Sequence, residues 1–182
     1  FLPKSDDEVK EMSKVLNIDE SYIKSISNQL REFNPMMGHR GCRLLISYPE
    51  IAEMQVRSII GASIEASKKL NIEIIPEIMI PLVGDVEEVK FLKDVIIKSS
   101  ESVMEEYGSR INYKIGTMIE TPRAALLADD IAKEVDFFSF GTNDLTQMTF
   151  GFSRDDSQKF LKNYYDQKIY EFDPFVSIDQ KG

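Results

Sequence analysis

The chain has 182 residues, of which 42% are hydrophobic and 29% are charged, and its formal net charge is −9. These proportions are those of an ordinary globular protein, so they exclude a disordered tail, a collagen-like repeat and a coiled-coil rod. The acidic balance argues against a nucleic-acid binder with a broad basic surface, and no apolar run approaches the roughly 18 residues that span a bilayer. An anionic ligand would need local help from arginine, a metal ion or backbone N–H groups.

Cellular location is indicated by cysteine usage and by the first residues. Cys42 is the only cysteine, and no secretory signal opens the sequence, so we expect a cytoplasmic protein without an internal disulfide. The sequence starts at Phe1 rather than at methionine, which suggests a piece of a longer protein.

The first third of the sequence predicts two helices. Ser5 and Glu8 have the spacing of a capping box at the start of the first. The second is expected from Asp19 to about Arg31, where apolar residues recur at helical spacing. The breaker cluster Asn-Pro-Met-Met-Gly at 34–38 then ends this helical segment.

From residue 43 onward, expected strands alternate with expected helices. The strands are expected at Arg43–Ser47, Ile72–Ile80, Tyr113–Ile119 and Val135–Phe140. The helices are expected at Pro49–Lys69, from Asp85 as N-cap to near Gly108, from Thr121 as N-cap to about Lys133, and at Asp156–Lys168.

This alternation predicts an α/β fold with a parallel sheet, and the nearly continuous apolar strands predict burial on both faces of that sheet. Two architectures fit: an open doubly wound sheet and a (β/α)₈ barrel. Because a barrel usually takes about 250 residues, four strand–helix units are either a small open sheet or a segment of a barrel.

Carboxylates interrupt or follow three of the expected strands. Glu77 lies within the second, Glu120 follows the third, and Asp144 follows the fourth. A carboxylate beside an apolar strand is costly to bury unless it is paired, hydrogen-bonded or bound to metal. Helix capping is the alternative explanation, and it suits Thr121 and Asn143 better than Glu120. We therefore favour a functional role for Glu120 and Asp144 as a pair, and favour it less for Glu77.

Two carboxylates at neighbouring strand ends suit a hard cation, and Mg²⁺ is the first candidate because it usually takes one or two carboxylates together with water and substrate oxygens. Gly141, Thr142 and Asn143 add an expected bare turn whose N–H groups could approach an anion.

The segment Gly-His-Arg-Gly-Cys-Arg at 38–43 places Arg40 and Arg43 beside glycines. This pattern fits phosphate binding as well as solvated charge in a loop. His39 is more often structural than catalytic in such a setting. Cys42 could have a depressed pKa between two arginines, but a small packed thiol is the favoured interpretation.

Four segments together resemble the phosphoenolpyruvate (PEP)-utilising enzymes, in order and across essentially the whole chain. They read Asn-Pro-Met-Met-Gly-His-Arg-Gly-Cys-Arg-Leu (34–44), Pro-Glu-Ile-Met-Ile-Pro-Leu-Val-Gly (76–84), Gly-Thr-Met-Ile-Glu-Thr-Pro-Arg-Ala (116–124) and Ser-Phe-Gly-Thr-Asn-Asp-Leu-Thr-Gln (139–147). Residues 38–43 and 148–156 are more similar to the dikinase branch of the family than to its synthase and sugar-phosphotransferase branches.

The resemblance implies part of the family's carboxy-terminal (β/α)₈ TIM-barrel domain, which binds PEP or pyruvate with Mg²⁺. It implies about four βα units in residues 34–182 and a helical lead-in in residues 1–33, all within a single domain. By motif, Glu120 and Asp144 would be the metal ligands, Arg40 would clamp the phosphoryl group and Arg154 is a weaker candidate for a phosphate contact. The residues expected at the substrate are Arg40, Glu120, Gly141, Thr142, Asn143 and Asp144.

For the dikinase branch, the resemblance implies the reaction of ATP, pyruvate and phosphate to AMP, PEP and diphosphate through a phosphohistidine on another domain of a homodimeric parent. Neither His39 nor Cys42 matches that histidine or the family's acid cysteine, so no catalytic residue is expected here and the fragment alone is expected to be inactive. A synthase or sugar-phosphotransferase barrel, or a noncatalytic metal- and ligand-binding fragment, are the alternatives.

Overall fold

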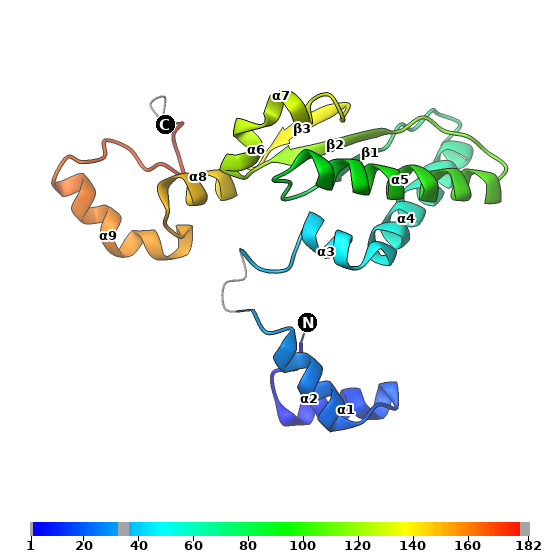
Figure 1. The fold of residues 1–182 in the computed structure, drawn as a ribbon, viewed down its shortest axis with the longest axis horizontal. Coiled ribbons are helices and arrows are strands. Elements are labelled where there is room, and N and C mark those ends of the chain that lie inside the picture. Colours follow the sequence, from blue (N-terminus) through cyan, green and yellow to red (C-terminus); the bar gives the residue numbers. More distant parts are fainter. Residues whose placement is uncertain (1, 33–36, 179–182) are drawn as a thin grey trace. The chain divides into compact units, whose positions relative to one another are not determined.

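The computed structural model describes residues 2–32 and 37–178, which divide into two compact units with their boundary between His39 and Arg40. The first unit contains α1 (Asp6–Leu16) and α2 (Glu20–Gln29), as the sequence predicts (Figure 1). Most of the predicted breaker cluster at 34–38 lies outside the described residues.

The capping of α1 differs from the prediction in one bond. The Ser5 hydroxyl accepts from the backbone N–H of Glu8, but the Glu8 carboxylate accepts from the backbone N–H of Lys4, at 2.6 Å, and forms no bond with Ser5 that would complete the box. Half of the predicted capping box is therefore present.

The second unit contains a three-stranded sheet in the order β1 (Glu77–Ile80), β2 (Lys114–Ile119) and β3 (Phe137–Phe140). Both pairs of strands are parallel, which confirms the predicted α/β class. The sheet is not closed within residues 2–32 and 37–178, and it has three strands there where the sequence predicted four.

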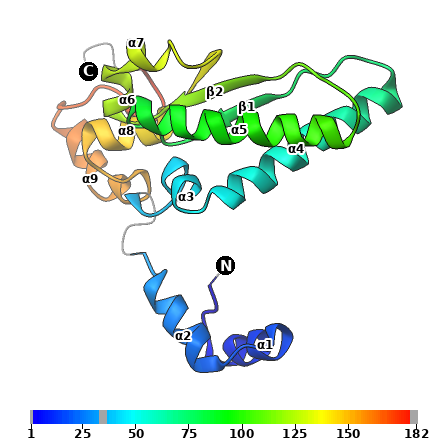
Figure 2. The same ribbon diagram turned by 45° about the vertical axis from the view of Figure 1, so that its right-hand side comes forward.

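Helices follow the strands and cover the sheet. Figures 1 and 2 both show α5 running along the sheet and α4 inclined to it, and a continuous apolar core joins these helices to the strands. The helices of this unit are α3 (Cys42–Ser47), α4 (Pro49–Leu70), α5 (Val86–Glu106), α6 (Pro122–Leu126), α7 (Ala128–Ile131), α8 (Thr142–Phe150) and α9 (Arg154–Asp166).

The predicted strand at Arg43–Ser47 is wrong, because these residues belong to α3. A short apolar run does not distinguish a strand from a buried helix by periodicity alone. Arginine and leucine favour helices, and Cys42, with Leu45 and Ile46, packs on the core cluster as one helical face.

Three further boundaries differ from the prediction. The strand expected at Ile72–Ile80 shortens to β1, because the ladder with β2 starts at Glu77. The helix expected to reach Lys133 divides into α6 and α7 at Leu127, whose φ is −104° and ψ is 15°. The last predicted helix starts two residues earlier, where Ser153 is the N-cap of α9.

The helices on either side of β1 start as predicted. Pro49 is the first residue of α4, and Asp85 and Glu88 form a complete capping box at the start of α5. Gly108 adopts a φ of +56° after α5, as expected for a residue that ends a helix.

The sequence predicted that both faces of every strand are buried, but only one face of β1 is buried. Ile78 and Ile80 are buried, whereas Glu77 and Met79 on the opposite face are exposed. Within the part of the chain that the structure describes, no helix is both long and apolar enough to cross a membrane.

Candidate functional site

The carboxyl ends of β2 and β3 lie side by side. Ile119 pairs with Phe140 in the sheet register, and the backbone N–H of Gly141 donates to the carbonyl of Ile119 at 3.1 Å. Because the next residue along each strand leaves the sheet at the same edge, Glu120 and Gly141 are neighbours.

Glu120 is 4% exposed, and its carboxylate is held from the end of β1 as well. The backbone N–H of Leu82 donates to Oε1 of Glu120 at 2.7 Å. The carboxylate that follows β2 is therefore held by the segment that follows β1.

Burial raises the pKa of Glu120 above its ordinary value, and the Leu82 N–H opposes this rise. A side-chain hydrogen bond with Asp144, and the negative charge of that residue, raise the pKa further. The positive charge of Arg40 opposes the rise. Two predicted site residues from distant parts of the chain, Arg40 and Asp144, thus both act on Glu120.

Asp144 is half-buried in the first turn of α8, directly after β3. The sequence predicted that the carboxylates of Glu120 and Asp144 meet at one rim of the sheet, and Asp144 contributes to the raised pKa of Glu120. Their assignment as ligands of one metal ion stays a prediction.

Gly141 lies where a larger residue would collide with Glu120. A Cβ built on Gly141 would come within 2.5 Å of both Cβ and Oε2 of Glu120, and within 2.9 Å of the Met118 sulfur. Atoms that are not bonded do not approach so closely, so a glycine is required for the Glu120 carboxylate to lie against this turn.

The predicted bare turn at 141–143 is wrong in its second half, because Thr142 and Asn143 open α8. Both side chains are exposed, and their N–H groups belong to the first turn of a nine-residue helix that has no side-chain cap. Such N–H groups attract anions as the expected turn would. Nη1 of Arg154 donates to Oδ1 of Asn143 at 3.2 Å, so Arg154 also lies beside this turn.

The donor set at this edge fits Mg²⁺ better than a metal that needs a cage of protein ligands. Among residues 2–32 and 37–178, no three His, Cys, Asp or Glu side chains form a cluster that could hold a metal. Mg²⁺ commonly takes one or two carboxylates and completes its six oxygen ligands with water and substrate. The Glu120 and Asp144 pair meets that requirement.

Three other residues singled out in the sequence do not join this cluster through the contacts described. Glu77 opens β1, at the amino edge of the sheet, and pairs with Lys114 at 3.3 Å. The backbone N–H of His39 donates to Glu32 within the first unit. Cys42 is buried, and burial, together with the nearby charge of Glu88, raises the pKa of its thiol to about 12, which supports a packed thiol.

Sequence reasoning missed the structural part played by Leu82. Its φ is +56°, a value that residues with a side chain rarely adopt, and its backbone contacts Glu120. The neighbouring Thr121 donates from Oγ1 to the carbonyl of Val83 at 2.9 Å and also caps α6. Nothing in the composition of Pro-Leu-Val identifies the parts that Leu82 and Val83 play, since these depend on backbone groups.

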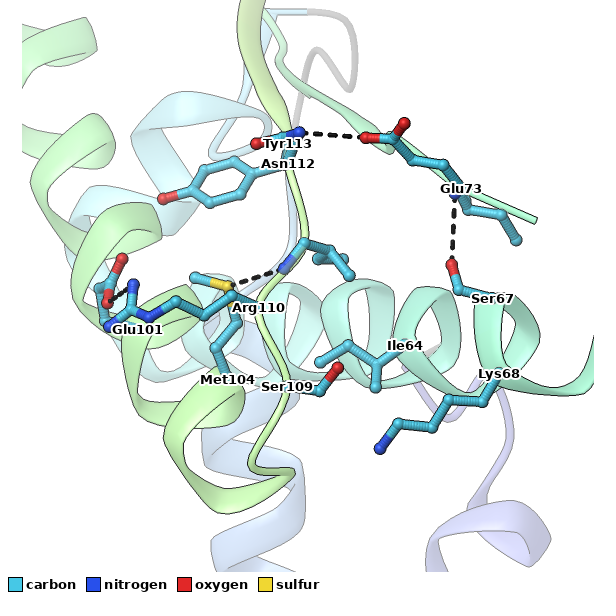
Figure 3. Close-up of a pocket in the computed structure, with 12 residues that line it drawn as sticks. Ile64, Ser67, Lys68, Glu73, Glu101, Met104, Ser109, Arg110, Asn112 and Tyr113 are labelled. Atoms are coloured by element: carbon cyan, nitrogen blue, oxygen red, sulfur yellow. Dashed lines mark hydrogen bonds and ion pairs between the residues drawn. The ribbon is translucent and has the colours of Figure 1, made fainter. Parts of the chain in front are cut away.

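A pocket of about 600 Å³ lies away from these carboxylates, at the amino ends of β1 and β2 (Figure 3). Its charged groups bind neighbouring protein atoms. Arg110 pairs with Glu101 at 2.8 Å, the Asn112 amide donates to Glu73 at 3.0 Å, and the Lys68 ammonium donates to the carbonyl of Tyr107 at 3.4 Å. Catalytic groups of α/β folds gather at the carboxyl ends of strands, so this pocket is not the candidate site.

Residues 3–177 match the family described as PEP-utilising enzyme, PEP-binding domain. The chain is 58% identical over 182 residues to the pyruvate, phosphate dikinase of Clostridium symbiosum, and 55% identical over 182 residues to that of Rhizobium meliloti. It is 53% identical over 184 residues to the chloroplastic pyruvate, phosphate dikinase of Flaveria pringlei. Each alignment covers the whole chain but 21%, 20% and 19% of the relative, so the chain spans about a fifth of the length of these curated relatives.

Proposed function

The chain belongs to the PEP-utilising enzymes, and on that premise we propose that its Glu120–Asp144 edge binds PEP or pyruvate together with Mg²⁺. The observation that carries the proposal is the meeting of a buried and a half-buried carboxylate where two parallel strands end. Without a cation this arrangement is unfavourable, because two negative charges repel and one of them is desolvated.

In this proposal, Glu120 and Asp144 hold the metal, which supplies positive charge to the substrate's oxygens when bound. Arg40 neutralises the phosphoryl group, because a guanidinium offers paired N–H donors to phosphate oxygens. The effect of Arg40 on the pKa of Glu120 supports a position for Arg40 close to the ligand that Glu120 would bind. The first turn of α8, with Gly141, Thr142 and Asn143, donates N–H groups to the substrate carboxylate.

We propose for the whole enzyme the reaction named for its relatives, in which ATP, pyruvate and phosphate give AMP, PEP and diphosphate through a phosphohistidine. The proposal includes a phosphohistidine domain in the same parent chain as the partner of this segment, and a parent that is a homodimer. It also includes a cytoplasmic location, although a plant relative is chloroplastic. A full (β/α)₈ barrel, of which the open sheet is a part, is the architecture we propose for the domain.

Isothermal titration calorimetry with the 182-residue chain tests ligand binding directly. We expect PEP to bind in the presence of Mg²⁺ and to lose most of that affinity when Mg²⁺ is removed with EDTA. We expect the chain alone to show no transfer of a phosphoryl group between ATP and pyruvate. Binding of Mg²⁺ without PEP would favour the alternative of a noncatalytic metal-binding fragment.

A chimaera provides the activity test. In it, the 182 residues of this chain replace the aligned segment of the Clostridium symbiosum dikinase, to which they are 58% identical. Conversion of pyruvate to PEP by the chimaera supports the proposed activity. A folded chimaera that performs the nucleotide half-reaction but neither binds PEP nor converts pyruvate would overturn it.

A further inference from the structure

The Pro81–Leu82 peptide connects two parts of the candidate site. Its N–H, from Leu82, donates to Oε1 of Glu120 at 2.7 Å, and its carbonyl, from Pro81, accepts from the backbone N–H of Cys42 at 3.0 Å. Because the N–H and C=O of a trans peptide point in opposite directions, this single planar group lies between the start of α3 and Glu120.

Further contacts fix this peptide in place. The Cys42 thiol donates to the Leu82 carbonyl at 3.1 Å, so α3 contacts two successive peptide groups. Leu82 keeps a φ of +56° and a buried side chain despite the steric cost of that backbone conformation. A strained residue persists only where its surroundings determine its conformation, which the bonds from Cys42 and to Glu120 do here.

The two oxygens of the Glu120 carboxylate therefore have different surroundings. Oε1 accepts the Leu82 N–H, whereas Oε2 is the oxygen that a Cβ on Gly141 would approach to 2.5 Å. Gly141 immediately precedes α8, whose first turn carries Asp144. Oε2 thus lies against the turn that leads into α8 and to Asp144.

We propose that Leu82 is a positioning residue: its backbone N–H holds Oε1 of Glu120 as a structural acceptor and leaves Oε2 as the oxygen that ligates the metal. This inference rests on the proposed function for the identity of the ligand. In this proposal, Oε1 has a structural role and Oε2 binds the metal, so Glu120 is a ligand through one oxygen only.

The Glu120→Gln substitution distinguishes the structural role of Oε1 from the metal-binding role of Oε2. The Leu82 N–H needs an acceptor, and the only acceptor of a glutamine side chain is its amide oxygen, so that oxygen takes the place of Oε1. The amide NH₂ then takes the place of Oε2, where it faces Asp144 as a donor and offers no lone pair to a metal. The variant should keep the fold and lose the metal.

The experiment measures thermal unfolding in metal-free buffer and Mn²⁺ affinity by electron paramagnetic resonance, using the whole 182-residue chain. We expect Glu120→Gln to unfold at the wild-type temperature or above and to lose at least tenfold in Mn²⁺ affinity. Glu120→Ala should lower both, because the Leu82 N–H then has no acceptor. Glu120→Asp should also lower both, since it keeps the charge but is one methylene too short to reach Leu82 and the metal together.

The outcomes are decisive in either direction. An unfolding temperature for Glu120→Gln as low as that of Glu120→Ala overturns the structural role of Oε1. Mn²⁺ affinity for Glu120→Gln within threefold of wild type overturns the role of Oε2. Failure of the wild-type chain to bind Mn²⁺ overturns the metal in the proposed function, whereas the unfolding comparison still decides whether Leu82 holds Glu120.

Discussion

Gly141 and Glu120 lie so close together that the glycine has no room for a side chain: a Cβ would come within 2.5 Å of the Glu120 carboxylate. Backbone pairing at the ends of β2 and β3 brings these two residues together. The position of the candidate metal-binding carboxylate therefore depends on the absence of one methyl group on the neighbouring strand end.

Gly141→Ala should displace the Glu120 side chain and lower Mn²⁺ affinity at least tenfold, a change of about 1.4 kcal/mol in binding free energy. Mn²⁺ titration of the 182-residue chain checks this. Gly84→Ala is the matched control, because the nearest atoms to its Cβ would lie at 3.8 Å, an ordinary contact. Equal affinities for the Gly141→Ala variant and the wild type would show that Glu120 does not bind the metal from this position.

Asp144→Asn should weaken Mg²⁺ binding, because it removes one of the two negative charges proposed as ligands. We expect a loss of about tenfold or more by calorimetry. Asp129→Asn is the control for net charge, since Asp129 is exposed on α7. Equal losses in the two variants would indicate a general charge effect rather than a ligand.

Arg40→Ala should weaken PEP binding about 10- to 150-fold, because a charge-assisted contact to phosphate contributes roughly 1.5–3 kcal/mol. The chimaeric dikinase gives the corresponding effect on the half-reaction that forms PEP. Arg110→Ala removes the same charge at the opposite edge of the sheet, where Arg110 pairs with Glu101, and should leave PEP binding unchanged. Unchanged binding and kinetics for Arg40→Ala would exclude the assigned role.

The raised pKa of Glu120 predicts a pH dependence of stability. Between the pKa of this group in the unfolded chain and its higher pKa in the folded chain, the folded chain binds more protons. The contribution of Glu120 to the free energy of unfolding therefore falls as pH rises through that window. Asp85 has the opposite sign, because the Glu87 N–H and then Arg123 lower its pKa, so its contribution is lost as pH falls.

Thermal unfolding of wild type and Glu120→Gln, measured from pH 4 to pH 8 in metal-free buffer, reports the contribution of Glu120 together with its interaction with Asp144, because the remaining carboxylates are common to both. We expect the unfolding temperature of wild type to fall relative to that of the variant as pH rises. Addition of Mg²⁺ should reduce the difference at high pH, since the metal binds the ionised carboxylate of wild type. A difference that is independent of pH would contradict the prediction.

The sequence by itself determined the helix starts at Pro49, Asp85 and Thr121, because a fixed proline φ and side-chain caps act within one turn of the helix. It also determined the parallel α/β class, and parallel neighbours place Glu120 and Gly141, the residues after β2 and β3, at the same edge of the sheet. These features depend on neighbours in sequence or on general rules of chain topology.

Only the tertiary structure decided that residues 43–47 form a helix and that α8 opens at Thr142, since short segments take the conformation that packs best on the core. It alone decided that Leu82 holds Glu120, because that bond uses a backbone N–H, which every residue except proline carries. The requirement for glycine at 141 likewise arises from Glu120, 21 positions away, which composition and periodicity do not reveal. Side-chain patterns specify the elements, whereas close contacts between strand ends specify which oxygen of the candidate site faces the ligand.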